Sequence, residues 1–449
     1  MLSRLVGMLS GNKATPDTPP PPAKAAVSAA LQAAPAAKTG SVMRREAMLG
    51  RDQKVAAYTF MLRRAPDELH DASLPDVQRL YDETLLNNLN NMEIARLLAQ
   101  RQAFIPISPA SLDHPLIAAW PTAGTVWSLK VIANTQVDDA LLARLAEMKA
   151  AGHSFALDAN ALMTPARHPL LPYIDYVLLD VSSEDIPTIT TQMAAISKLA
   201  AGKQFVATEV QTLEAFHMCH KLQFARFSGP FITRHEKLDC PVLGPSRAKV
   251  LDLMNRVRTG AEQSELVEHF RHDPALSVRL LRYVNSPGIG LLHKVGGIEQ
   301  ALMIMGQDKL YRWLTLILFT GGQAQELDSA VLENALVRAR VAEQLASKAL
   351  FAKARDEVFV TGLFSLLDVV MHMPMDQILK QVSLPVEITE AIVSLRGPYA
   401  PYLALAIACE QDDLGSIETL SAQIGRDVAE INAIHMDALL WTQEIAIDV

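Results

Sequence analysis

The sequence predicts a chain of two folded parts, a parallel α/β sheet or barrel followed by an all-α bundle. Short apolar strand-like runs alternate with helical stretches from Val42 to about Thr233, which is typical of parallel sheets. From Pro241 onward the apolar residues recur only at helical spacing. Residues 11–39 are rich in Ala and Pro and cannot bury a core. We therefore expect a tail over 1–40, the α/β part over 41–240 and the helical part over 241–449.

Composition limits the class of protein. The 449 residues are 50% hydrophobic and 20% charged, as expected for a packed protein. The net charge of −8 argues against a general nucleic-acid binder. No run of about 18 apolar residues occurs, so no membrane span is expected. The three scattered cysteines, Cys219, Cys240 and Cys409, indicate buried thiols in a reducing cytoplasm rather than a disulfide framework.

The elements of the α/β part follow from the apolar pattern. The expected strands are 55–58, 103–107, 125–132, 154–158, 176–181, 204–208 and 224–227. A helix is expected over 138–151, and further helical material lies between residues 76 and 99. Several strands end in a polar residue, and in a barrel these ends form the face where chemistry is located.

The helical part has one segment with a clear start. Asp273 suits the N-cap and Pro274 the first position of a helix that ends near Asn285. A second helix is expected near Ile298, followed by one that carries Leu310 and Trp313. Further helices are expected over 250–258, 264–271, 326–350, 356–371, 385–392, 402–409, 416–424 and 428–444.

Two blocks of this part carry a family resemblance. DPALSVRLLRYVNS, followed at the family's spacing by IEQALMIMGQDKLYRWL, resembles the opening of the HDOD domain. That domain is a helical module related to HD phosphohydrolases but without their metal ligands. Ser365 and Leu366 stand where the His-Asp dyad would be, so the resemblance implies a surface that binds other signalling proteins.

Two groups of residues are candidates for partner binding. Ile289, Leu291 and Leu292 follow Pro287 in a loop with glycines at its ends. A basic outer side is predicted from Arg279 and Arg282, together with Lys309, Tyr311 and Arg312. It could dock an acidic partner, although a solvated face is the commoner explanation.

The α/β part resembles the EAL domain, a TIM-type barrel whose active members hydrolyse cyclic di-GMP. The segments that carry this resemblance are GRDQKVAAYTFMLRR, GHSFALD, YVLLDV and FVATEVQTLEAFHMCHKLQFARFSGPF. The resemblance places the family's site at Thr59, Arg63, Pro106, Lys130, Asp158, Ala159, Asp180, Thr208, Gln211 and Ser228.

Most of these positions lack a metal ligand. Only Asp158 and Asp180 keep a carboxylate, and Lys130 reverses the charge of the family's glutamate. Two divalent ions need several carboxylates to offset their charge, so the sequence predicts a degenerate site without metal, cofactor or catalytic residue. The two aspartates could still hold one metal, or Asp180 could meet Lys130 or an amide. His217, His220 and His235 could suggest zinc, but a solvated or capping role is favoured.

These observations together predict a non-enzymatic, cytoplasmic signalling adaptor that acts through protein–protein contacts. The resemblance links it to cyclic di-GMP regulation of motility, attachment or virulence. Its partners would be other signalling proteins, and self-association is left open. The alternatives are a sensor that binds cyclic di-GMP without cleaving it, with Arg63 and Lys130 on the phosphates, and a residual phosphodiesterase.

Overall fold

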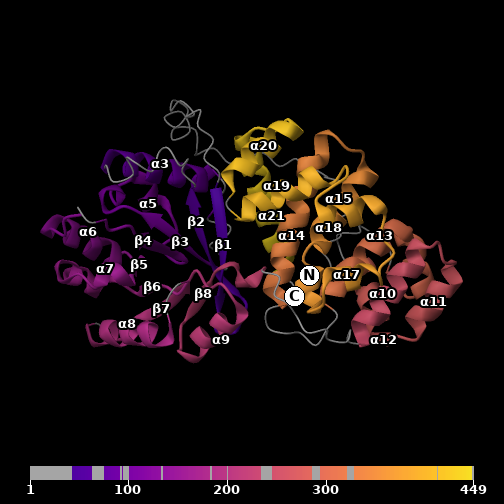
Figure 1. Cartoon of the computed structure of the whole chain (residues 1–449), viewed down its shortest axis with the longest axis horizontal. Coiled ribbons are helices and arrows are strands. Elements are labelled where there is room, and N and C mark those ends of the chain that lie inside the picture. Colours follow the sequence, from indigo (N-terminus) through magenta and orange to yellow (C-terminus); the bar gives the residue numbers. More distant parts are fainter. Residues whose placement is uncertain are drawn as a thin grey trace.

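The structure is a computed structural model that describes residues 43–62, 75–91, 94, 101–132, 135–182, 185–199, 201–233, 245–285, 294–320, 328–411 and 413–446. It places a barrel and a helical half side by side (Figure 1). No helix in these ranges is both long enough and apolar enough to cross a bilayer. The expected tail and the expected boundary at residue 240 lie outside the described residues, so that division of the chain stays a prediction.

The first half is a closed eight-stranded barrel with strands in sequence order. The strands are β1 (Met43–Gly50), β2 (Val55–Leu62), β3 (Gln102–Ile107), β4 (Thr125–Leu129), β5 (Ser154–Asp158), β6 (Tyr176–Asp180), β7 (Gln204–Thr208) and β8 (Arg226–Ser228). β1 runs antiparallel to both β2 and β8, and the other neighbours are parallel. The predicted α/β barrel is therefore confirmed.

Helices cover the outside of the barrel (Figure 1). They are α3 (Pro75–Asn91), α5 (Pro115–Ala119), α6 (Asp139–Ala150), α7 (Ala159–Leu162), α8 (Ile186–Leu199) and α9 (Leu213–Lys221). α6 begins where the sequence predicts, because the Asp138 side chain accepts a hydrogen bond from the Leu141 amide at 2.9 Å. Leu145 and Met148 of α6 are buried against the barrel, as expected of its apolar face.

The barrel interior is a packed core rather than a pore. One layer is formed by side chains that alternate along the strands: Met48, Ala57, Phe104, Val126, Ala156, Tyr176 and Val206. Phe104 and Tyr176 meet edge to face, with ring centroids 5.1 Å apart. The residue two positions further along each parallel strand lies on the same face, so this layer is the floor below the carboxyl ends of the strands.

The second half is a helical bundle. Its helices are α10 (Pro245–Arg258), α11 (Gln263–Arg271), α12 (Pro274–Val284), α13 (Ile298–Thr320), α14 (Asp328–Leu345), α15 (Ala352–Phe364), α16 (Leu367–Met371), α17 (Met375–Leu379), α18 (Val386–Ser394), α19 (Ala400–Gln411), α20 (Leu414–Ile424) and α21 (Val428–Ala446). The predicted start of α12 is confirmed, since Asp273 caps it by accepting from the Leu276 amide at 3.0 Å.

α13 and α15 show how the bundle is organised. α13 bends at Gly306, whose φ of 68° separates two helical stretches, as expected from the two apolar patterns there. α15 is central, because every residue from Val358 to Phe364 is buried. It packs closely on α14: a Cβ added to Gly362 would lie 2.6 Å from the Ala339 Cα.

Two expectations about elements were wrong. The strand predicted first, over 55–58, is preceded by β1, whose sequence MRREAMLG is too charged to read as a strand. The helix expected over 356–371 is two helices, since Leu366 is not helical and the Ser365 hydroxyl donates to the Gly362 carbonyl at 2.7 Å. A side chain that bonds to the preceding turn in this way competes with the backbone ladder.

Candidate functional site

The carboxyl ends of the barrel strands bring most of the predicted positions together. Seven of these positions lie on the same face of the strands as the interior layer, most of them two residues further along the strand. They are Thr59, Pro106, Lys130, Asp158, Asp180, Thr208 and Ser228. Ala159 starts α7 and is buried, and Gln211 lies beyond β7. Arg63 lies outside the described residues. These residues form one rim, which we call the barrel mouth.

The two aspartates of the barrel mouth are partly used by the backbone. Asp158 accepts a hydrogen bond from the Asn160 amide at 2.8 Å and caps α7. Asp180 accepts one from the Ser182 amide, also at 2.8 Å, which is one of the two partners considered for it. Both side chains and Lys130 are exposed, so two carboxylates and an ammonium group face solvent at this rim.

β1 adds a carboxylate that the sequence reasoning missed. Because β1 is antiparallel, its beginning lies at the barrel mouth, where Glu46 pairs with Thr59. Glu46 is on the same face as the interior residue Met48, and its carboxylate lies 3.2 Å from the Arg44 guanidinium. No local signal marks Glu46, because the charged residues Arg44, Arg45 and Glu46 obscure the strand pattern of β1. Even so, no group of three metal-ligating side chains is close enough to hold an ion within the described ranges.

The loops after β7 and β8 pack closely because Gly229 has no side chain. Gly229 has a φ of 147°, and a Cβ there would lie 2.2 Å from the Val210 carbonyl oxygen. The Val210 amide donates to the Ser228 carbonyl at 2.9 Å, and Glu209 adopts a left-handed φ of 57°. This segment fixes where Glu209 and Gln211 stand at the rim.

A cleft of about 1200 Å³ separates this rim from the helical half. Arg44, Glu46 and Glu209 line it from the barrel, and Arg338 and Glu410 line it from α14 and α19. Arg338 is buried, and its guanidinium contacts the Glu410 carboxylate at 2.6 and 2.9 Å.

Ser365 occupies the position that the HDOD resemblance aligns with the histidine of the dyad. The Ser365 hydroxyl accepts a hydrogen bond from Arg338 at 2.8 Å, and Leu366 is fully buried. The Arg338 guanidinium therefore lies beside Ser365 and is hydrogen-bonded on both sides, by Ser365 and by Glu410.

A buried ion cluster joins the halves. Glu333 of α14 receives two hydrogen bonds from Arg101, at 2.7 and 2.9 Å, and lies 4.0 Å from Arg45 of β1. The Arg45 guanidinium stacks 4.2 Å from the centre of the Tyr58 ring. Burial lowers the pKa of Arg45 to about 10 and raises that of Glu333 to about 7, the two charges opposing these shifts. Such a cluster fixes the relative position of the halves, because breaking it leaves an unpaired buried charge.

The predicted basic outer side of the helical half is wrong in part. Arg279 and Arg282 are exposed on α12 as expected, and so is Lys309. Tyr311 and Arg312 are instead buried, because the α13 stretch after Gly306 turns that pair toward α15. Ile289, Leu291 and Leu292 lie outside the described residues, so their role in partner binding stays a prediction.

Two of the cysteines and two of the histidines singled out in the sequence lie among the described residues. Cys219 and Cys409 are buried, and burial raises their thiol pKa to about 11 and about 12. His217 is exposed, and the His220 ring nitrogen lies 3.0 Å from the Arg51 carbonyl oxygen. Cys240 and His235 lie outside the described residues.

Fold and rim together define a class, a two-part protein that couples an α/β barrel to a helical bundle. The HDOD domain model matches residues 241–386. This match agrees with the HDOD resemblance of the helical half, which follows the closed eight-stranded barrel.

Two relatives extend over most of the chain. A Vibrio cholerae serotype O1 protein named cyclic di-GMP phosphodiesterase CdgJ is 24% identical over 374 residues, which is 82% of this chain and 85% of the relative. The uncharacterized protein YuxH of Bacillus subtilis strain 168 is 22% identical over 412 residues, covering 89% of this chain and 98% of the relative.

Solved structures align with the barrel half. An EAL domain protein from Listeria monocytogenes EGD-e covers 43% of this chain and 88% of its own, at 15% identity and a TM-score of 0.36. The PaMucR phosphodiesterase in complex with c-di-GMP covers 43% of this chain and 96% of its own, with the same identity and TM-score.

The expectation that the chain is not an enzyme is contradicted by these comparisons. The Vibrio cholerae relative, similar across both halves, is named a phosphodiesterase. The expectation judged catalysis only from the acids at positions given by the resemblance. It left out Glu46, which the antiparallel β1 brings to the barrel mouth.

Proposed function

We propose that this chain is a signalling protein of the cyclic di-GMP network, in which the barrel mouth takes the nucleotide and the helical half contacts other signalling proteins. The observation that carries the proposal is the similarity to a cyclic di-GMP phosphodiesterase along 82% of the chain, through both halves. The proposed outputs are motility, attachment or virulence, which rest on the resemblance alone.

The chemistry of the barrel mouth supports a nucleotide with two phosphates. Lys130 is exposed at the end of β4 and offers an ammonium group to a phosphate oxygen. The hydroxyls of Thr59, Thr208 and Ser228 lie on the same interior face and can donate hydrogen bonds. A cyclic dinucleotide presents two phosphates and two polar bases, which suits a rim of donors around an apolar floor.

Calorimetry with the full chain and cyclic di-GMP tests this proposal. We expect saturable binding that Lys130→Glu weakens by about tenfold or more, since it replaces attraction with repulsion. Lys198→Glu is the matched control, because Lys198 lies in the last turn of α8, at the opposite end of the barrel. Absence of heat up to about 1 mM nucleotide, or equal loss in both variants, would rule out the barrel mouth as the site.

Hydrolysis of cyclic di-GMP is a second candidate, favoured by the name of the Vibrio cholerae relative. Glu46, Asp158 and Asp180 are the carboxylates on the interior face of the mouth that could engage a divalent ion. The assay is formation of the linear dinucleotide with Mg²⁺ or Mn²⁺. If the chain hydrolyses the nucleotide, Asp158→Asn should abolish turnover while Asp113→Asn, an exposed acid on the outer loop after β3, leaves it unchanged. Turnover that survives Asp158→Asn would place the chemistry elsewhere.

The partner surface is proposed for the exposed face of α12. Arg279 and Arg282 are exposed there together with the apolar Val278, whose side chain is 48% exposed. A cationic and apolar face of this kind suits an acidic partner protein. α12 lies at the far side of the helical half from the barrel (Figure 1), which leaves it accessible while the barrel is occupied.

A further inference from the structure

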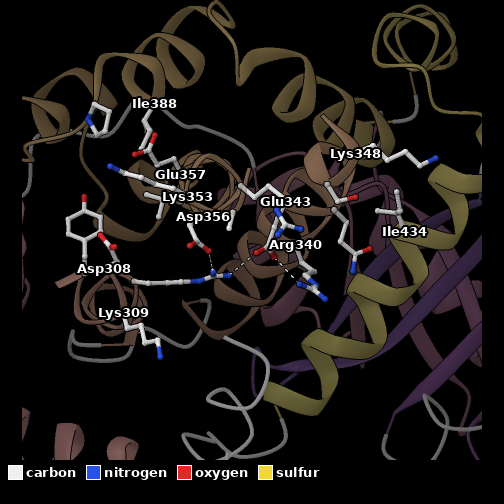
Figure 2. A pocket seen from close by; sticks show the side chains of 18 of the residues that line it. Asp308, Lys309, Arg340, Glu343, Lys348, Lys353, Asp356, Glu357, Ile388 and Ile434 are labelled. Carbon is white, nitrogen blue, oxygen red and sulfur yellow. Dashed lines mark hydrogen bonds and ion pairs between the residues drawn. The ribbon is translucent and has the colours of Figure 1, made fainter. Parts of the chain in front are cut away.

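The helical half contains a second cleft, distinct from the barrel mouth. It has a volume of about 990 Å³ and lies among α13, α14, α15, α18 and α21. Figure 2 shows charged side chains around it, from Lys353 and Asp356 on one side to Lys348 on the other. All of its lining residues belong to the helical half, so its occupant does not depend on the function proposed for the barrel. The volume is that of a small-molecule site.

The cleft is positively charged in an acidic chain. Eight Lys or Arg and five Asp or Glu line it, which leaves a surplus of three positive charges, whereas the whole chain carries −8. A local surplus of this sign in a concave surface concentrates anions.

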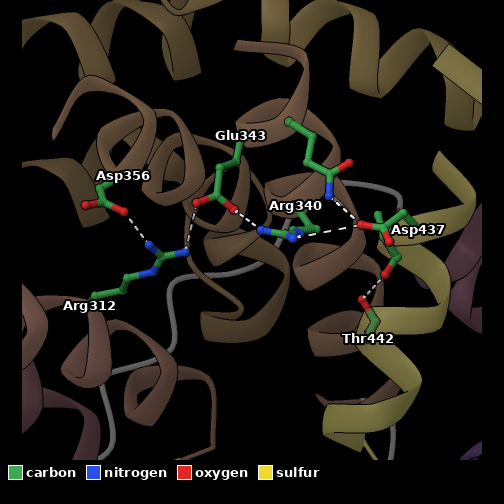
Figure 3. A network of polar contacts seen from close by, with 8 residues as sticks. Arg312, Arg340, Glu343, Asp356, Asp437 and Thr442 are labelled. Atoms are coloured by element: carbon green, nitrogen blue, oxygen red, sulfur yellow. Dashed lines mark hydrogen bonds and ion pairs between the residues drawn. The ribbon is translucent and has the colours of Figure 1, made fainter. Parts of the chain in front are cut away.

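Four of the five acids of the cleft are paired with arginine or lysine, and Asp308 is the exception among the described residues. Glu343 lies between two arginines, 3.3 Å from Arg312 and 2.9 Å from Arg340, and Arg312 also pairs with Asp356 (Figure 3). The Arg312 guanidinium stacks 4.0 Å from the centre of the Phe359 ring. Glu343 and Asp356 therefore hold the arginines in place and are not themselves available to a cation.

Two lysines of the cleft are not neutralised in this way. Lys309 and Lys353 are exposed, and neither lies within ion-pair distance of a carboxylate in the described part of the chain. Their ammonium groups supply most of the surplus positive charge that a ligand would meet.

Buried polar atoms of the lining also lack partners. The hydroxyl of Tyr311 and the Nε of Arg312 are buried without a hydrogen bond to any described group. Tyr311 is only 8% exposed, and burial raises its pKa to about 12, so the hydroxyl is a neutral donor. Buried donors are nearly always satisfied in folded proteins, so these two groups remain available to a ligand or a water molecule that enters the cleft.

We propose that this cleft binds a phosphorylated small molecule that carries at least two negative charges. Arginine and lysine are the side chains that recognise phosphate, the first by its fixed fork and the second as a mobile point charge. The preformed arginines would orient the phosphoryl oxygens, and Lys309 and Lys353 would neutralise them. A small movement of the lining brings the Tyr311 hydroxyl within reach of the same ligand.

The test is calorimetry of the full chain with inorganic pyrophosphate at constant ionic strength. We expect saturable binding that the double variant Lys309→Gln/Lys353→Gln weakens by about tenfold or more. The matched control removes two exposed lysines from the barrel, Lys198→Gln/Lys221→Gln, and should leave the affinity unchanged. Equal weakening in both double variants, or sulfate competing as well as pyrophosphate, would mean only general screening and would overturn the proposal.

Tyr311→Phe provides a second measurement that separates binding from folding. It removes a hydroxyl that bonds to no described group, so the melting temperature should hold or rise. Pyrophosphate affinity should nevertheless fall several-fold. An unchanged affinity in this variant together with an unchanged affinity in the cleft double variant would rule the site out.

Discussion

His435 of α21 should make the protein sensitive to acid. Its side chain is buried, and burial lowers its pKa from 6.5 to about 4, with the nearby Arg45 charge acting in the same direction. The unfolded chain therefore binds a proton more tightly than the folded one. The stabilising contribution is complete above pH 6.5 and is lost as the pH falls through about 4. At about 1.4 kcal/mol per pKa unit, the loss amounts to about 3 kcal/mol.

Glu333 opposes this effect in the same pH range. Burial raises its pKa from 4.5 to about 7, although Arg45 favours the carboxylate. Its contribution is complete below pH 4.5 and is lost as the pH rises through 7, again by about 3 kcal/mol. The stability of the wild type should thus change less between pH 4.5 and 7 than that of a variant lacking either group.

The assay is urea unfolding of the full chain at intervals from pH 4.5 to 7.5. The difference in unfolding free energy between wild type and His435→Gln isolates the histidine, because every other group titrates in both proteins. Between pH 7.5 and pH 4.5 the wild type should lose about 2–3 kcal/mol of unfolding free energy relative to His435→Gln. His217→Gln is the control, since that ring is exposed on α9. A constant difference for His435→Gln, matching the control, would refute the reasoning.

Two substitutions probe the packing. Glu333→Ala removes the two hydrogen bonds from the Arg101 guanidinium to the carboxylate and leaves the one to the Tyr58 hydroxyl. It should lower the unfolding free energy by about 3–5 kcal/mol, measured by urea unfolding at pH 7.5. A loss below about 1 kcal/mol would show that the cluster does not hold the halves together. Gly362→Ala places a Cβ 2.6 Å from the Ala339 Cα and should cost about 1–3 kcal/mol. Gly415→Ala in α20 meets only one side-chain oxygen, at 3.7 Å, and should be neutral or slightly stabilising.

Most barrel strands could be predicted because each is marked by a pattern within its own few residues. The ranges expected for β5 and β7, 154–158 and 204–208, are those observed, since both are short apolar runs bounded by polar residues. β1 was missed because Arg44, Arg45 and Glu46 interrupt its apolar pattern. Arg45 is paired with Glu333 of the distant α14, and no local pattern contains that information.

The helical cleft shows the same limit. Tyr311 and Arg312 follow each other on α13, and their sequence reads as a basic surface. Both residues are buried instead, because the helix bends at Gly306 and the Arg312 guanidinium lies across the Phe359 ring. Pairings such as Arg312 with Glu343 join residues from different helices. Sequence spacing can assign a residue to a helix face but cannot say which other helix covers that face.

α14 connects the sites that these experiments address. It supplies Glu333 to the junction with the barrel, Arg338 to the cleft beside the barrel mouth, and Arg340 and Glu343 to the helical cleft. Because one helix carries all of these side chains, a ligand that tightens the arginines of the helical cleft also restrains the helix that holds the barrel. Pyrophosphate should therefore raise the unfolding temperature of both halves together. In Glu333→Ala, where the link is removed, it should raise that of the helical half alone.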